Sequence, residues 1–160
     1  VFTWSFASTT NTMVSNIIGQ DKKERVFELI KKIIKLSMTF SVSMAVLLNI
    51  FPHAFLSLFG QGNDFAEAAL PVLRVVSVAL VMMSFSTIWL NAVTGTGNTE
   101  VNLAIEIITI IFYCIYVYLT LGYFNLSILY GWMSEYVYWM TTFTFAFFYI
   151  RSGRWKKKVI

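Results

Sequence analysis

One stretch of the chain, residues 101–121, is long enough to cross a bilayer and yet is polar along one side. A helix of this length spans roughly 31 Å at ~1.5 Å per residue, and its single charged residue is Glu106. Polar residues recur along it at alternating steps of four and three: Asn102, Glu106, Thr109, Tyr113, Tyr116 and Thr120. That spacing places them on one helical face, opposite Leu, Ile, Phe and Val. In a helix surrounded by lipid, we expect such a polar face to turn toward protein or a watery cavity.

The chain as a whole is too apolar for a water-soluble domain. Of its 160 residues, 58% are hydrophobic and 12% are charged, whereas soluble domains carry about 25% charged residues. We therefore expect a membrane protein whose main partner is the lipid bilayer. The single cysteine, Cys114, and the single histidine, His53, provide neither a disulfide framework nor a thiolate metal site, so we expect no cofactor. Because the chain begins at Val1 inside an uncharged segment, we interpret it as a fragment of a longer protein.

Five segments are expected to cross the membrane as helices, at residues 1–20, 36–59, 72–94, 101–121 and 127–150. A basic amphipathic segment, residues 21–35, separates the first two, and a basic tail follows at residues 151–160. Residues 60–69 are predicted to form an acidic loop, with Pro71 in the first turn of the next helix. The Gly-rich stretch 95–100 is predicted to be a turn. The sequence thus predicts an all-α, polytopic transmembrane helix bundle of about five spans.

The distribution of Lys and Arg predicts how this bundle is oriented. Eleven of the twelve basic residues lie at 22–35 or 151–158, and the four predicted spans between these clusters place both on one side of the membrane. The positive-inside rule assigns that side to the cytoplasm, with Asp64 outside. We therefore expect a multi-pass protein of the inner (cytoplasmic) membrane. The same rule accounts for the basic clusters without a nucleic-acid partner.

Two carboxylates are predicted to lie at membrane depth, where a charge costs at least ~2.5–3.5 kcal/mol. Glu135 is expected near the middle of the bilayer, close to Tyr113, and Glu106 nearer the cytoplasmic boundary, close to Thr142. One interpretation is that each carboxylate exchanges a proton or binds a cation. The alternative for Glu135 is a structural carboxylate that accepts hydrogen bonds from Tyr or Trp side chains, and Glu106 could instead snorkel or pair with neighbouring helix ends.

Two further groups of residues are candidates for contact with a transported solute. A polar stripe that includes Asn91 runs along the segment 72–94, where hydrogen bonds between helices are the favoured interpretation over a solute pathway. An aromatic cluster that includes Tyr138 could stack on an organic cation or form an interfacial belt. The members of that cluster are Tyr130, Trp132, Tyr136, Tyr138 and Trp139.

Several motifs, in this order and at this spacing, resemble the multidrug and toxic compound extrusion (MATE) family. They are IIGQDKKERVFELIKK at 17–32, FP at 51–52, NAVTGTGNT at 91–99, EIITIIFYCIYVY at 106–118, SEYVYW at 134–139 and SGRWK at 152–156. The resemblance runs through nearly the whole chain. It implies that the five segments are helices eight to twelve of twelve, in the C-terminal part of the second of two six-helix lobes.

The resemblance also implies a function, which is secondary antiport. Small organic, often cationic, compounds would leave the cell as Na⁺ or H⁺ enters, by alternating access between this lobe and a missing N-terminal lobe. One departure from the family pattern matters here. Members with a coupling carboxylate on the tenth helix would carry it near Met83 or Ser84, and neither is acidic. Coupling by this lobe would therefore use Glu135, Glu106 or groups outside the chain.

Three other functions compete with the antiporter. A flippase for lipid-linked saccharides, from the same broad superfamily, would favour a larger and more basic cavity, whereas the predicted buried charges here are acidic. A membrane-embedded enzyme would need a catalytic cluster at membrane depth, and one His with two separated Glu residues supports this poorly. The chain is thus not expected to be an enzyme. A purely structural membrane subunit is the third alternative.

Overall fold

The computed structural model describes residues 2–60 and 62–157, and this part of the chain is helical with short connections. The long helices are α1 (Phe2–Gly19), α2 (Val26–Ile50), α4 (Gly62–Gly95), α5 (Thr99–Val117) and α7 (Ser134–Ser152). Two short helices lie between long ones: α3 (Pro52–Ser57) follows α2, and α6 (Ile128–Trp132) precedes α7. A π-helical turn at Tyr118–Tyr123 extends α5, and 3₁₀ turns occupy Lys23–Arg25 and Arg154–Lys157. The all-α prediction is confirmed for the described residues.

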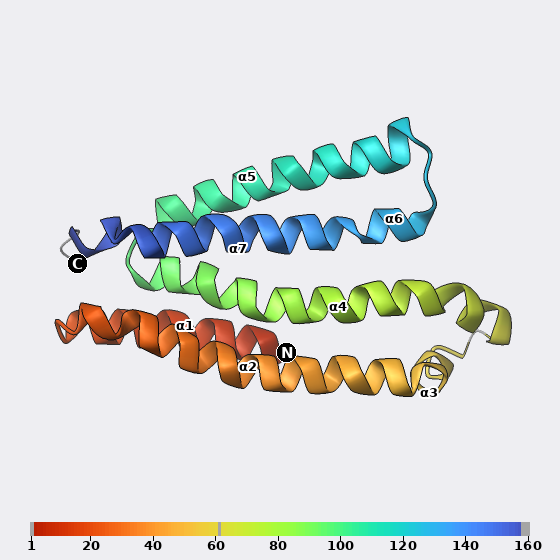
Figure 1. Cartoon of the computed structure of the whole chain (residues 1–160), viewed down its shortest axis with the longest axis horizontal. Coiled ribbons are helices and arrows are strands. Elements are labelled where there is room, and N and C mark those ends of the chain that lie inside the picture. Colours follow the sequence, from red (N-terminus) through yellow and green to blue (C-terminus); the bar gives the residue numbers. More distant parts are fainter. Residues whose placement is uncertain (1, 61, 158–160) are drawn as a thin grey trace.

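The long helices lie side by side, with α4 in the middle of the bundle (Figure 1). Helix α4 packs against α1 and α2 on one side and against α7 on the other, and α5 packs mainly against α7. The α1–α2 connection, the α4–α5 turn and the C-terminal tail lie at one end of the bundle (Figure 1). Helix α3, the start of α4 and the α5–α6 connection lie at the other end. We call the first the basic end, because both clusters of Lys and Arg are there.

Three helical segments are long and apolar enough to cross a membrane: Lys23–Ile50, Asp64–Gly95 and Thr99–Tyr123. Their outer faces carry large apolar side chains that are about half exposed, such as Leu47, Val78 and Ile111. Such exposure suits a lipid environment and would be unfavourable in water. The chain is therefore an all-α, multi-pass transmembrane helix bundle. Helices α1 and α7, which fall within the spans predicted at 1–20 and 127–150, lie alongside these segments. Their crossing of the membrane remains a prediction. Val1 lies outside the described residues.

The acidic loop predicted at residues 60–69 is wrong, because α4 already begins at Gly62. Pro71 lies inside this 34-residue helix instead of in its first turn. A proline there has no N–H to donate to the carbonyl oxygen four residues earlier, which is a common cause of helix bending. In Figure 1 the first turns of α4 lie off the axis of the rest of the helix. Asp64 then falls in the first helical turn, where a carboxylate interacts favourably with the helix dipole.

The turn predicted at residues 95–100 is confirmed, because α4 ends at Gly95 and α5 begins at Thr99. Gly97 adopts a positive φ of 76° there, a conformation that favours glycine. The segment 127–150 is divided, since α6 ends at Trp132 and α7 begins at Ser134. This division places Glu135 in the first turn of α7.

The apolar core of the described residues lies toward the basic end. Its buried side chains come from α1, α2, α4, α5, α7 and the tail, and they include Val14, Ile30, Ile88, Trp89, Val93, Ile150 and Trp155. Trp155 is only 3% exposed, and its Nε1–H donates a hydrogen bond to the carbonyl oxygen of Ile150 at 2.9 Å. The tail therefore begins as a packed part of the fold; residues 158–160 lie outside the described residues.

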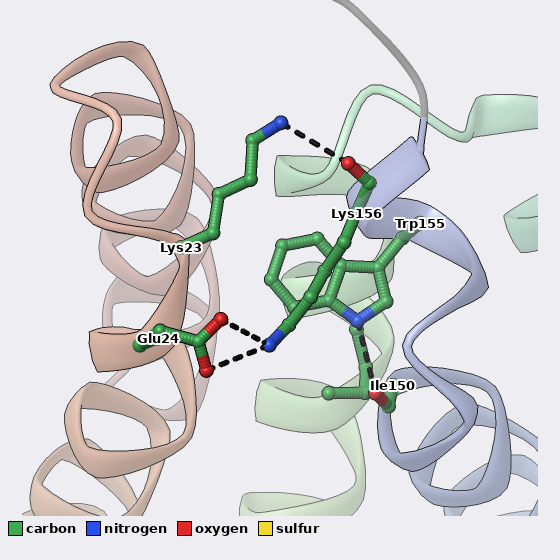
Figure 2. A network of polar contacts seen from close by, with 5 residues as sticks. All are labelled: Lys23, Glu24, Ile150, Trp155 and Lys156. Atoms are coloured by element: carbon green, nitrogen blue, oxygen red, sulfur yellow. Dashed lines mark hydrogen bonds and ion pairs between the residues drawn. The ribbon is translucent and has the colours of Figure 1, made fainter.

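A polar network joins this tail to the 3₁₀ turn Lys23–Arg25, which precedes α2 (Figure 2). The ammonium group of Lys156 lies 2.7 and 2.8 Å from the two carboxylate oxygens of Glu24. Lys23 Nζ donates a hydrogen bond to the carbonyl oxygen of Lys156 at 3.1 Å. The two basic segments therefore meet at one end of the bundle, as the count of predicted spans between them requires.

Candidate functional site

The polar stripe of α5 faces inward, as predicted. Thr109 and Thr120 are buried, and the other four members, Asn102, Glu106, Tyr113 and Tyr116, are half-buried. The flanking residues Leu103 and Ile107 are 59% and 50% exposed. Since α5 packs mainly against α7, the stripe faces that helix. We call this surface, formed by the α5 stripe with Glu135, Tyr138, Trp139 and Thr142 of α7, the polar seam.

The middle of the polar seam is held by hydroxyl and aromatic contacts. Thr142 Oγ1 lies 3.4 Å from Thr109 Oγ1 and donates to the carbonyl oxygen of Tyr138 at 2.9 Å. The ring of Tyr113 meets the ring of Tyr138 edge to face, with centroids 6.1 Å apart. Tyr138 in turn packs edge to face against Trp139 at 4.8 Å. Three aromatic rings therefore form a continuous group within the seam.

Glu135 lies at the α7 N-terminal end of the polar seam and is half-buried. Its Oε2 accepts a hydrogen bond from Trp139 Nε1 at 2.9 Å, a donor of the kind that the structural interpretation expects. The predicted partner Tyr113 instead packs on Tyr138. Within the described part of the chain, Oε1 of Glu135 has no hydrogen-bond partner. One carboxylate oxygen is thus held by Trp139, and the other can bind a proton or a cation.

Glu106 lies toward the opposite end of the polar seam. Its Oε1 accepts a hydrogen bond from Asn102 Nδ2 at 3.3 Å, while Asn102 Oδ1 is buried without a partner among the described residues. The predicted neighbour Thr142 bonds to Thr109, which lies nearly one helical turn beyond Glu106. Both carboxylates, Glu106 and Glu135, are close enough to Tyr138 to act electrostatically on its hydroxyl group. The aromatic group therefore lies within reach of an acidic side chain on either side.

Asn91 belongs to α4 and lies outside the polar seam. Its Nδ2 donates to the carbonyl oxygen of Thr87 at 2.9 Å, and most hydroxyl groups of this stripe bond back to their own helix in the same way. Ser77 also accepts a hydrogen bond from Asn49 of α2 at 2.8 Å. The Asn49–Ser77 bond joins two helices, whereas the other bonds named here lie within α4, so the interpretation of the stripe as a packing surface stays a prediction.

Two contacts that position the seam were not foreseen. Ser86 Oγ donates to the carbonyl oxygen of Trp139 at 2.9 Å, and Tyr136 OH donates to the carbonyl oxygen of Val75 at 3.0 Å. They fix the N-terminal half of α7 against α4. Ser86 lies off the polar stripe of its helix, so the spacing of polar residues carried no signal for it.

The seam offers oxygen ligands in place of a catalytic cluster. No group of three or more His, Cys, Asp and Glu residues could hold a metal ion among the residues that the structure describes. The seam does contain two carboxylates, an amide oxygen and threonine hydroxyl groups. Oxygen atoms of these kinds suit a proton or a hard monovalent cation, and aromatic faces suit an organic cation.

Two comparisons with known proteins found a match to this chain. A family model described as MatE matches residues 1–119. The chain is also 23% identical over 150 residues to a Thermotoga maritima protein named "Probable multidrug resistance protein NorM". That alignment covers 93% of this chain and 32% of the relative, so the chain spans about a third of the length of the protein it matches. No solved structure matches.

Proposed function

The chain belongs to the MatE family of membrane transporters, and we propose that it is the C-terminal part of a cation-coupled antiporter that exports small organic compounds. The observation that carries the proposal is the polar seam, in which a helix otherwise suited to lipid turns a carboxylate, tyrosines and threonines inward. Residues of that kind at membrane depth are expensive and typical of transport pathways. The name of the relative, which refers to multidrug resistance, agrees with an organic substrate.

The transport cycle requires a second lobe. A secondary transporter moves one bundle against another around a central site, and this chain supplies a single bundle. The matched relative is about three times as long as the aligned region, which leaves room for such a partner. We propose that the missing N-terminal lobe closes a cavity against this one. The intact antiporter would lie in the inner (cytoplasmic) membrane.

The substrate that suits this lobe is an organic cation. Tyr113, Tyr138 and Trp139 form a continuous aromatic group. A ring face attracts a cation by about 2 kcal/mol or more when water is excluded. Glu135 adds a negative charge at one edge of that group. A cation that stacks on these rings competes with Na⁺ or H⁺ for the same carboxylate, which is the simplest physical basis for exchange of one for the other.

Replacement of Glu135 by glutamine tests this mechanism. Gln keeps a carbonyl oxygen that can accept the Trp139 hydrogen bond, so the Glu135→Gln transporter should fold normally. It loses the charge, so ion-driven efflux of a fluorescent organic cation from proteoliposomes should fall at least about tenfold, which corresponds to ~1.4 kcal/mol. Glu106→Gln should have a smaller effect. The matched control is Glu67→Gln, an exposed residue near the start of α4.

Normal coupled efflux by Glu135→Gln, with folded protein verified by size-exclusion chromatography, would show that the carboxylate is structural. Coupling would then reside in groups outside this chain or at Glu106. A flippase would give a different result, because transport of a lipid-linked saccharide would persist while efflux of the organic cation would be absent in the unmodified protein. The acidic character of the seam favours the antiporter.

The orientation can be tested separately. Since Cys114 is exposed, a Cys114→Ser background is needed before single cysteines are placed at positions 31 and 64. We expect an impermeant thiol reagent applied outside intact cells to modify position 64 and to spare position 31. Modification of position 31 from outside would reverse the assigned orientation.

A further inference from the structure

A groove lies between α5 and α7 toward the basic end, separate from the polar seam. Its volume is about 530 Å³, within the ~300–1,000 Å³ of pockets that hold small ligands. The walls of the groove are apolar and include Ala104 and Ile108 of α5, with Phe145 and Phe148 of α7. None of the carboxylates or ring groups of the polar seam lines it.

The groove opens toward the surroundings of the bundle along one side. Phe148 and Phe145 are 60% and 40% exposed, and they stand on the outer part of its wall. From Glu100 to Ile108 the α5 side of the groove runs about 12 Å along the helix axis. An apolar channel of this length on the outer surface of a membrane helix pair is continuous with the hydrocarbon of the bilayer.

Among the residues that the structure describes, one positive and one negative side chain line the mouth of the groove. Arg154 comes from the tail and Glu100 from the first turn of α5, and both line the groove. Neither makes an ion pair within the part of the chain that the structure describes. Ser152 and Tyr149 complete the polar rim. Both charges are therefore available to an outside ligand.

We propose that this groove binds a phospholipid whose headgroup carries a primary amine, as phosphatidylethanolamine does. One acyl chain lies between Ile108, Phe145 and Phe148. The guanidinium of Arg154 forms charge-assisted hydrogen bonds with the phosphate, a geometry for which Arg is well suited. The carboxylate of Glu100 accepts hydrogen bonds from the ammonium group of the same headgroup.

The pair of charges selects this headgroup over its competitors. An anionic lipid without an amine, such as phosphatidylglycerol, would place its net negative charge beside Glu100 and would offer that carboxylate neutral hydroxyl donors in place of an ammonium group. Phosphatidylcholine has a quaternary ammonium group that cannot donate a hydrogen bond to Glu100. The proposal does not depend on the transport function, because it concerns a surface apart from the seam.

The test is lipid retention by the intact transporter in native mass spectrometry, after incubation in detergent with a single lipid. The unmodified protein should retain phosphatidylethanolamine more strongly than phosphatidylglycerol or phosphatidylcholine. Arg154→Gln should weaken retention of all three about tenfold, or ~1.4 kcal/mol. Glu100→Gln should remove the preference for the amine. Ala104→Phe, which fills the groove from an exposed position, should reduce retention without removing any charge.

The matched control is Lys31→Gln, which removes an exposed positive charge near the same end of the bundle without touching the groove. Loss of retention in this variant equal to that in Arg154→Gln would show non-specific charge attraction and would overturn the proposal. Equal retention of phosphatidylglycerol and phosphatidylethanolamine by the unmodified protein would also overturn it. Undiminished retention of phosphatidylethanolamine by Ala104→Phe would overturn the proposal as well. The acyl chain would then lie elsewhere, or the missing helices would cover the groove.

Discussion

The contact between α1 and α4 gives a sharp test of how tightly this bundle is packed. At Gly95 the two helices approach so closely that an added Cβ would lie 2.7 Å from the carbonyl oxygen of Asn11 and 2.8 Å from Cβ of Val14. Real Cβ atoms essentially never come so near. Because the obstructing atoms belong to or adjoin the backbone, rotation of a side chain cannot relieve the clash. Gly95→Ala therefore forces α1 away from α4.

The loss of stability caused by Gly95→Ala can be estimated from the contacts that must change. Overpacking of a well-packed site costs about 1–3 kcal/mol. If α1 shifts, the hydrogen bond from Ser15 Oγ to the carbonyl oxygen of Gly95, 3.0 Å long, is also lost, at ~0.6 kcal/mol for such bonds in membrane proteins. Alanine, which has a better helix propensity than glycine, stabilises the helix by about 0.5–1 kcal/mol. The balance is a loss of about 0.6–3 kcal/mol.

The assay is thermal unfolding of the intact transporter in detergent, with Gly19→Ala as the matched control. Gly19 also ends a helix and does not have a positive φ, but an added Cβ there meets nothing within 4 Å. Gly19→Ala should leave the unfolding midpoint unchanged or raise it slightly, whereas Gly95→Ala should lower it. Equal midpoints for the two variants would refute the close approach of α1 to α4.

Three more predictions concern the tail and the seam. Trp155→Ala should destabilise the protein by about 3–5 kcal/mol, because the ring is almost fully buried. Trp155→Phe should destabilise it by only about 1 kcal/mol, through the lost hydrogen bond. Chemical denaturation measures both losses of stability. A double-mutant cycle on Glu24 and Lys156 should give a coupling of at most about 1 kcal/mol, since the Glu24 side chain is 86% exposed, and the coupling should vanish in high salt. Thr142→Val should lower the stability of the protein by roughly 0.6 kcal/mol, because its hydroxyl contact with Thr109 is lost. A larger loss would show that the seam depends on this contact more than its 3.4 Å length implies.

The sequence predicted the faces of helices better than their ends. The inward position of Thr109 and the outward position of Ile107 follow from spacing alone, because the period of a helix fixes which side chains share a face. The start of α4 could not be found in this way. Pro71 suits the first turn of a helix and also occurs in bent interiors, and the tertiary packing of α4 decides between these positions.

In the candidate site, too, the sequence predicted which residues face the interior but not which partners they contact. The alternation of polar residues correctly predicted that Tyr113 faces inward, and Thr142 was expected beside that polar face; both lie at the interface of α5 and α7. Their individual partners depend on how far α7 slides along α5, which is set by the break between α6 and α7 at Met133. No sequence period encodes that shift. The burial of Trp155 was missed for a different reason, since its basic neighbours are typical of a solvated tail.

The network between Lys156 and Glu24 also has a consequence for biosynthesis. These residues are separated by 132 positions, and a ribosome adds about 5–20 residues per second. The turn before α2 that carries Glu24 therefore waits roughly 7–26 s before the lysine that binds its carboxylate has even been made. For most of the same interval α7, against which Trp155 packs, has not been made either. Early helices of this lobe must be held by the insertion machinery or by lipid until the tail arrives, which makes that interval the period of greatest vulnerability to membrane quality-control proteases.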